Sequence, residues 1–316
     1  MQPNPVQPTL VQSADVQPSR LKVISILTLG ILSVSFAAIF IRLASRAAPL
    51  EGPLFALVIA AGRMGLAALL LLPTTLLGLQ RYSLQRRQWL YILGAGFFLA
   101  LHFLSWISSL EYTSVAASTA LVTTNPLWVS LFSWLFLGES PSKQTWIGAG
   151  IALAGGALIG LGQEGGLSSN PLLGNALALV GAVAVSAYFL LGRQVQLSGV
   201  PITLYSGLVY AVAALFLVPL PLLTGVGYSA PLEAYLWIGL LALVPQVLGH
   251  TSFNWAVKYV NPTLVTVLIL LEPIGASLAA ILLFKEIPGP GVLIGALLLL
   301  LGVGVALWQP LGSRKT

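Results

Sequence analysis

Apolar residues occur in long runs along almost the whole chain, and polar residues gather in the short segments between the runs. A run of about 18 or more apolar residues is long enough for an α-helix to cross a bilayer, and such runs recur from Leu21 to Trp308. The pattern therefore predicts an all-α integral membrane protein. We predict ten membrane-spanning helices, at roughly residues 22–44, 53–77, 88–109, 113–137, 142–162, 171–192, 202–222, 232–256, 260–284 and 289–309.

The two ends of the chain lack this pattern. Residues 1–20 place several prolines among Gln, Ser and Asn, a composition that cannot bury a core, so we expect a disordered tail. No positively charged residue precedes an apolar core there, so we do not expect a signal peptide. Residues 310–316 form a second short tail.

The second half of the chain repeats the first. Residues 259–302 align without a gap on residues 112–155, at a distance of 147 positions. Leucine matches mean little in so apolar a chain, but Tyr, Pro, Glu and Gly in one register are rarer coincidences. The matched pairs include Tyr112 with Tyr259, Pro126 with Pro273, Glu139 with Glu286, Gly148 with Gly295 and Gly155 with Gly302. We therefore predict two five-helix units, at residues 21–162 and 171–309.

Composition supports a membrane protein and excludes several other classes. The chain is 57% hydrophobic and 7% charged, whereas soluble domains carry about 25% charged residues. With no cysteine, it has neither a disulfide framework nor a thiolate metal site. The net charge of +6 is scattered over loops and tails rather than clustered on one face, so we predict no nucleic-acid partner.

The basic residues predict the orientation in the membrane. With a cytoplasmic N-terminus, ten of them lie on the inside: Arg20, Lys22, Arg81, Arg86, Arg87, Lys143, Arg193, Lys258, Arg314 and Lys315. Arg42, Arg46 and Lys285 then lie outside, which satisfies the positive-inside rule with both termini in the cytoplasm. Because each unit has an odd number of spans, the two units must be inverted relative to each other. Inverted repeats suit alternating access, with a site near the bilayer midplane.

Two five-span units, each with a proline inside its fourth span and a glutamate just after it, resemble the EamA repeats of the drug/metabolite transporter superfamily. The residues concerned are Asn125-Pro126 with Gly138-Glu139, Glu272-Pro273 with Lys285-Glu286, Phe103 through Thr113, and Arg63 with Ala67 and Ala68. The second unit departs from the family pattern at Lys285, where glycine is usual, and has no basic counterpart of Arg63. The resemblance covers residues 21–309. It implies a ten-helix inner-membrane carrier, often an exporter of metabolites or amino acids.

Two charged residues inside predicted spans are candidates for a substrate site. Glu272 lies mid-span, where a carboxylate is costly unless it faces the bundle interior or water. It either couples protons or substrate, or it braces the kink at Pro273; the neutral Asn125 at the equivalent position supports the second reading. Arg63 either binds a substrate carboxylate, or it packs internally or extends to the headgroups.

Polar stripes on the third and eighth spans are the other candidates. His102, Ser105, Trp106 and Ser109 share one helix face, and Gln246, His250 and Asn254 form a similar stripe after Pro245. Facing inward, the stripes would provide hydrogen bonds and an aromatic wall for a small polar ligand. Alternatively, they make polar contacts between helices. Our candidate substrate-binding residues are Arg63, His102, Trp106, Ser109, Asn125, His250, Asn254 and Glu272.

Glycines and glutamates near the fifth and tenth spans have simpler structural explanations. Glycines in both spans allow close helix packing. Glu139 and Glu286 precede these spans, with Ser140-Pro141 predicted as N-cap and first helical residue. A carboxylate is favourable near a helix N-terminus, so we interpret both glutamates as structural.

The function predicted best is secondary transport, with export preferred, of a small polar metabolite, amino acid or drug-like solute across the plasma membrane. The alternatives are an intramembrane lipid-modifying or hydrolytic enzyme, a channel, or a membrane scaffold. An HExxH motif and a ring-forming filter sequence are absent from the sequence. We expect no cofactor, no metal and no enzymatic activity. Substrate, direction, proton coupling, and a monomeric or homodimeric state stay open.

Overall fold

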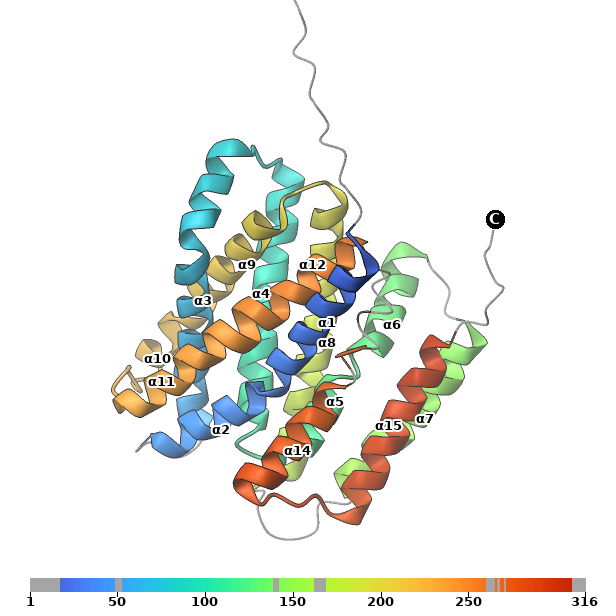
Figure 1. The fold of residues 1–316 in the computed structure, drawn as a ribbon. Coiled ribbons are helices and arrows are strands. Elements are labelled where there is room, and N and C mark those ends of the chain that lie inside the picture. Colours follow the sequence, from blue (N-terminus) through green and yellow to red (C-terminus); the bar gives the residue numbers. More distant parts are fainter. Residues whose placement is uncertain are drawn as a thin grey trace, which may run out of the picture.

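The computed structural model describes residues 18–48, 53–138, 142–161, 169–259, 265, 268, 269 and 271–308, and all regular elements in these residues are helices. Figure 1 shows them as one bundle. The helices are α1 (Arg20–Ser35), α2 (Ala37–Ala47), α3 (Pro53–Arg81), α4 (Arg86–Ser109), α5 (Val115–Val122), α6 (Asn125–Leu137), α7 (Lys143–Leu161), α8 (Pro171–Leu197), α9 (Ile202–Leu217), α10 (Pro219–Leu223), α11 (Leu232–Leu241), the π-helix η1 (Ala242–His250), α12 (Thr251–Tyr259), α14 (Glu272–Phe284) and α15 (Pro290–Leu307).

Seven helical segments are long and apolar enough to cross a membrane: Arg20–Ala47, Leu54–Arg81, Arg86–Ser109, Val115–Phe136, Pro171–Leu197, Ile202–Leu223 and Leu232–Ala256. Three shorter apolar helices, Trp146–Gly156, Glu272–Phe284 and Pro290–Ala306, lie within the other predicted spans. The all-helical membrane fold is confirmed for the described residues. The count of ten spans stays a prediction. The two tails also stay predictions, because residues 1–17 of the tail at 1–20 and the whole tail at 310–316 lie outside the described residues.

The predicted fourth span, 113–137, is two helices rather than one. Helix α5 ends at Val122, and α6 begins at Asn125 with Pro126 in its first turn. Proline lacks the N–H that a continuing helix would need, but it is well suited to a first turn. In the second repeat, α14 begins at Glu272 with Pro273 in its first turn. The matched prolines therefore start half-helices in both repeats.

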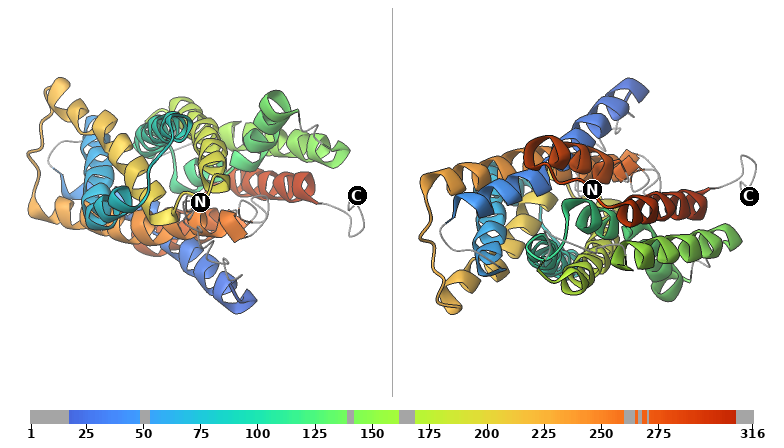
Figure 2. Two further views of the ribbon diagram at one scale, coloured as in Figure 1. Left: turned by 90° about the horizontal axis from the view of Figure 1, so that it is seen from above. Right: turned by 90° about the horizontal axis from the view of Figure 1, so that it is seen from below.

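Equivalent helices of the two repeats pack against each other. Helix α3 packs on its equivalent α9, and α7 packs on its equivalent α15. In addition, α5 of the fourth span packs on α14 of the ninth, and α4 packs on α8 just as α11 and η1 pack on α2 and α1. These helix pairs are the ones expected when a two-fold axis relates the two repeats. Figures 1 and 2 show α7 and α15 side by side at one edge of the molecule.

The equivalent helices run in opposite directions. On the α3–α9 pair, Gly78 lies against Leu204, while Gly65, further back along α3, lies against Val218, further forward along α9. On the α7–α15 pair, Gly155 lies against Leu299 and Gly148 against Ala306. Backbone approaches this close require residues without a side chain.

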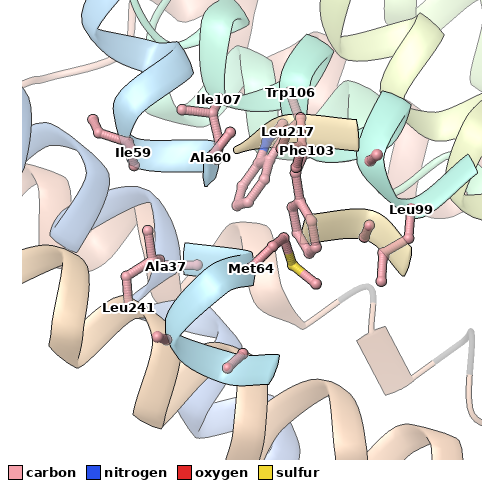
Figure 3. Close-up of a cluster of buried hydrophobic side chains, with 14 of the residues drawn as sticks. Ala37, Ile59, Ala60, Met64, Leu99, Phe103, Trp106, Ile107, Leu217 and Leu241 are labelled. Carbon is pink, nitrogen blue, oxygen red and sulfur yellow. The ribbon is translucent and has the colours of Figure 1, made fainter. Parts of the chain in front are cut away.

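A large apolar core holds the first three helices of each repeat together. It includes Ile59 and Met64 of α3, Phe103 and Trp106 of α4, and Leu217 of α9, all buried. Figure 3 shows Phe103 and Trp106 pointing from α4 into this cluster. The core therefore fixes the face of α4 that carries His102.

Glu286 is structural, as predicted, but it caps a different helix from the one expected. Its carboxylate accepts a hydrogen bond from Val115 N at 2.6 Å, and therefore caps α5 of the other repeat rather than its own following helix. It also lies 3.8 Å from Arg42 Nη1, and Arg42 Nη2 donates to Thr113 O at 2.8 Å. This group ties the two repeats together at one end of the bundle. Glu139, Ser140 and Pro141 lie outside the described residues.

Candidate functional site

A small cavity lies between the two repeats. Its volume is about 40 Å³, enough for about three water molecules. Helices from both repeats contribute to it. The lining residues are Val34, Ala37, His102, Trp106, Val122, Thr123, Asn125, Val185, Phe189, His250, Phe253, Ile269 and Glu272.

Two half-helices begin at this cavity. Asn125 is the first residue of α6 and Glu272 the first of α14, and both line the cavity. The two residues are equivalent by the 147-residue repeat. Because a helix N-terminus carries partial positive charge and free N–H groups, each half-helix favours negative charge at its start. Glu272 meets that preference, whereas Asn125 supplies a neutral side chain.

The polar stripes of the third and eighth spans meet at the same place. The rings of His102 and His250 are 6.5 Å apart, and His102 stacks on Trp106 at 5.9 Å. His102 Nδ1 lies 2.9 Å from Gly181 O. Since a carbonyl oxygen only accepts, Nδ1–H is the donor and Nε2 is left as an acceptor.

Three lining groups are without hydrogen-bond partners in the described residues. They are Trp106 Nε1, Asn125 Oδ1 and His250 Nδ1. A buried polar group without a partner costs about 1–3 kcal/mol. The cavity is therefore built to hydrogen-bond something polar, either water or a solute.

Arg63 lies beside this cavity and is fully buried, so its side chain does not extend to the headgroups. Its Nε donates to Gln246 Oε1 at 2.8 Å, and its guanidinium lies over the Phe103 ring at 3.9 Å, a cation–π contact. Nη1 and Nη2 lack a partner among the described residues.

Two of the candidate residues lie elsewhere. Ser109 Oγ lies 2.6 Å from both Trp106 O and Ser118 Oγ, and so joins α4 to α5. Asn254 Oδ1 accepts from Tyr188 Oη at 2.7 Å in a polar cluster between α8 and α12. Neither residue lines the cavity.

Sequence reasoning left two residues out of the candidate list. Thr123 lines the cavity at the break between α5 and α6, and Gln246 holds Arg63. The break was signalled by Pro126, two residues beyond the Thr123–Thr124 turn. Gln246 was recognised only as part of a polar stripe.

A helical membrane protein of two equivalent units, with half-helices beginning at a buried polar cavity, has the architecture of a membrane transporter. The sequence profile of the EamA-like transporter family matches residues 21–161 and 172–308. The chain therefore belongs to the EamA-like transporter family, which confirms the resemblance predicted from the two proline motifs.

Curated relatives carry related names. The "Uncharacterized inner membrane transporter YedA" of Escherichia coli strain K12 is 30% identical over 53% of this chain and 54% of its own length. The "Probable terminal-alkyne amino-acid exporter" of Streptantibioticus cattleyicolor is 29% identical over 64% of this chain and 67% of its own. The matched part thus spans about half the length of the first of these relatives.

A solved structure entitled "Crystal structure of protein" is similar in fold. Its TM-score is 0.60, and the match covers 94% of this chain and 100% of that one. Sequence identity is 21%, so the likeness shows the fold alone.

Proposed function

We propose that this protein is a secondary transporter that exports a small zwitterionic metabolite, of which amino acids are the leading class, across the inner membrane by alternating access. The observation that carries the proposal is the cavity between the repeats. The carboxyl group of Glu272 lines it, the Arg63 guanidinium lies 6.0 Å from the ring of the lining residue Trp106, and three polar lining groups have no protein partner in the described residues. The "amino-acid exporter" name of one relative supports this substrate class.

The cavity has to open for transport to occur. Its volume of about 40 Å³ is too small for an amino acid, so a solute would bind only after the repeats separate at one end. In this proposal, the Arg42–Glu286 contact, which joins the repeats at one end of the bundle, would break when that end opens. With ten spans, inverted repeats and cytoplasmic termini, that end would face outward, as the basic residues indicate.

Five of the candidate residues have a defined role in this proposal. Arg63 would bind the solute carboxylate through Nη1 and Nη2, which are without partners in the described residues. Glu272 would bind the ammonium group or exchange its place with a proton. Trp106, with the imidazoles of His102 and His250, would form the wall that excludes water.

Solute counterflow in liposomes tests the proposal. Purified protein would be reconstituted in liposomes loaded with one unlabelled amino acid at a time, and uptake of the labelled form would be followed. We expect counterflow for at least one amino acid, a loss of about tenfold or more in Arg63→Met, and little change in Ser109→Ala, whose side chain lies away from the cavity. Folded protein that shows no counterflow with any amino acid would refute this substrate class. Turnover of a lipid or peptide would instead favour the enzyme alternative.

A further inference from the structure

The structure assigns Gln246 as the residue that positions Arg63. It also assigns a one-residue insertion in the second repeat, visible as the π-helix η1, as the feature that brings Gln246 to Arg63. The importance for transport rests on the proposed function, because Arg63 is there the substrate-binding cation. The positioning itself stands on contacts in this structure.

The repeat register before η1 differs from the register after it. Upstream, the sequence AALLLLP at 67–73 matches AALFLVP at 213–219, and WLYI at 89–92 matches YLWI at 235–238. Both matches have an offset of 146 positions. Downstream, the match of residues 112–155 to residues 259–302 has an offset of 147. One extra residue therefore lies between Ile238 and Tyr259.

Contacts in the structure show more closely where the extra residue lies between Ile238 and Tyr259. Helix α8 packs on the third span of the first repeat, where a Cβ on Gly181 would meet Trp106 and Ser105. Helix α1 packs on the third span of the second repeat, where a Cβ on Gly30 would meet Phe253 and Ser252, which stand 147 positions after Trp106 and Ser105. The later register already applies at Ser252, so the extra residue lies between Ile238 and Ser252.

The π-helix η1, Ala242–His250, occupies this interval. A π-helix fits one more residue into a turn than an α-helix, and such turns are frequent at functional sites. Pro245 inside η1 removes one backbone donor and eases the wider turn. The equivalent part of α4 is an uninterrupted α-helix.

The insertion coincides with the two polar residues that break the symmetry of the repeats. By the offset of 146, Arg63 corresponds to Val209, and Gln246 falls opposite Leu99 or Ala100 in either register. All these counterparts are apolar and buried. Arg63 and Gln246 thus occur once each, in opposite repeats, and they contact each other at 2.8 Å.

This contact determines which face of the guanidinium is available. Gln246 Oε1 accepts from Nε, the one nitrogen on the chain side of the group, and the Phe103 ring covers one face. Nη1 and Nη2 are left without partners in the described residues. Without Gln246, the buried Nε–H of Arg63 would have no acceptor, which is costly, and the guanidinium would rotate until Nε–H reached another acceptor.

Two measurements that need no substrate test the assignment. In a Thr123→Cys background, free of other cysteines, the rates of labelling by an anionic and a cationic methanethiosulfonate report the charge in the cavity. In protein labelled with ¹⁵N-arginine, the Arg63 Nε–H signal, identified by its loss in Arg63→Met, reports the hydrogen bond.

We expect the ratio of anionic to cationic labelling to fall about tenfold or more in Arg63→Met. Gln246→Leu should lower the ratio at least threefold and make Nε–H exchange with solvent at least tenfold faster. Gln246→Glu should lower the ratio as well, because its charge cancels that of Arg63, yet keep Nε–H protected. This opposite pattern separates positioning from a general loss of structure.

A deletion tests the insertion. Removing the exposed Leu243 should convert η1 to an α-helix and keep the folded yield. The Arg63 Nε–H should then exchange with solvent as fast as it does in Gln246→Leu. Removing the similarly exposed Phe97 from α4, which has no spare residue, should abolish folding. If Gln246→Leu shows the wild-type Nε–H exchange rate and labelling ratio, the assignment is overturned. If the exchange and labelling results are as expected but counterflow is absent, only the transport proposal is refuted. Where Thr123→Cys does not react, the exchange measurement alone decides.

Discussion

The backbones of the two repeats approach each other closely along α7 and α15, which allows a quantitative prediction for Gly155→Ala. A Cβ on Gly155 would lie 2.5 Å from Leu299 N and 2.6 Å from Gly295 O, both backbone atoms. Ordinary contacts of a Cβ begin at 3.4 Å. Backbone cannot move aside as a flexible side chain does, so the two helices would have to separate by about 0.9 Å.

The cost follows from that separation. Inserting a methyl group into a tightly packed interface typically costs about 1–3 kcal/mol, and a gap of this size forfeits a quarter to a half of each neighbouring dispersion contact. Replacing glycine by alanine inside a helix returns up to about 1 kcal/mol. Gly150→Ala on the same helix is the matched control, because a Cβ there meets nothing within 4 Å.

The assay is unfolding of the purified protein in detergent. We expect Gly155→Ala to be less stable than Gly150→Ala by about 1–3 kcal/mol, since the helix propensity term is the same in both. The double variant Gly148→Ala/Gly155→Ala should lose less unfolding free energy than the sum of the two single variants, because one separation of α7 from α15 relieves both clashes. Equal stability of Gly155→Ala and Gly150→Ala would refute the close packing of α7 on α15.

Four further predictions concern charged groups and topology. Glu286→Ala should lower stability by about 2–4 kcal/mol, because Val115 N–H loses its acceptor and Arg42 its partner, while Glu286→Gln should cost less in the same unfolding assay. Burial raises the pKa of Glu111, which lies in the loop after α4. The folded state therefore binds the proton more tightly, stability falls as pH rises from about 4.5 through the folded pKa, and Glu111→Gln should stabilise at pH 7 but not at pH 4. If Glu272 couples protons, Glu272→Gln should still show counterflow, at a lower affinity for a zwitterion, but lose accumulation driven by a pH gradient; gradient-driven uptake at the wild-type rate would end that role. A reporter that is active only outside the cytoplasm, fused after Thr316, should stay silent, and a strong signal would mean a miscounted span.

The features predicted well from sequence are those encoded within single helices. A run of apolar residues, a proline in the middle of it, and a polar stripe at helical spacing are local properties. For this reason the prolines at 126 and 273 can be placed inside their spans, and His102 and Trp106 on one helix face, from the sequence alone. The repeat added the relation between distant parts, because it identified Asn125 and Glu272 as equivalent.

The features missed depend on contacts between helices. Glu286 was placed at the start of its own span because a carboxylate favours the nearest helix N-terminus, whereas the fold brings the N-terminus of α5 closer. Ser109 shares a helix face with His102, but Ser118 of the next helix takes its hydroxyl. The sequence leaves Arg63 three roles, namely binding a substrate carboxylate, packing internally or extending to the headgroups, and its hydrogen-bond partner Gln246 lies 183 positions away.

The distribution of charge between the repeats bears on the substrate. The first repeat contributes the cation Arg63 and a neutral Asn125, while the second contributes the ionisable carboxyl group of Glu272 and an apolar Val209. Each repeat therefore supplies one ionisable group, and no direct hydrogen bond joins the two among the described residues. A simple anion would pair with Arg63 and leave Glu272 unbalanced, and a simple cation would do the reverse. A zwitterion satisfies both, and a proton on Glu272 would let the cavity return empty. This is why we propose a zwitterionic substrate in preference to a singly charged one, and why Glu272→Gln should weaken zwitterion binding more than binding of the matching carboxylate without its amino group.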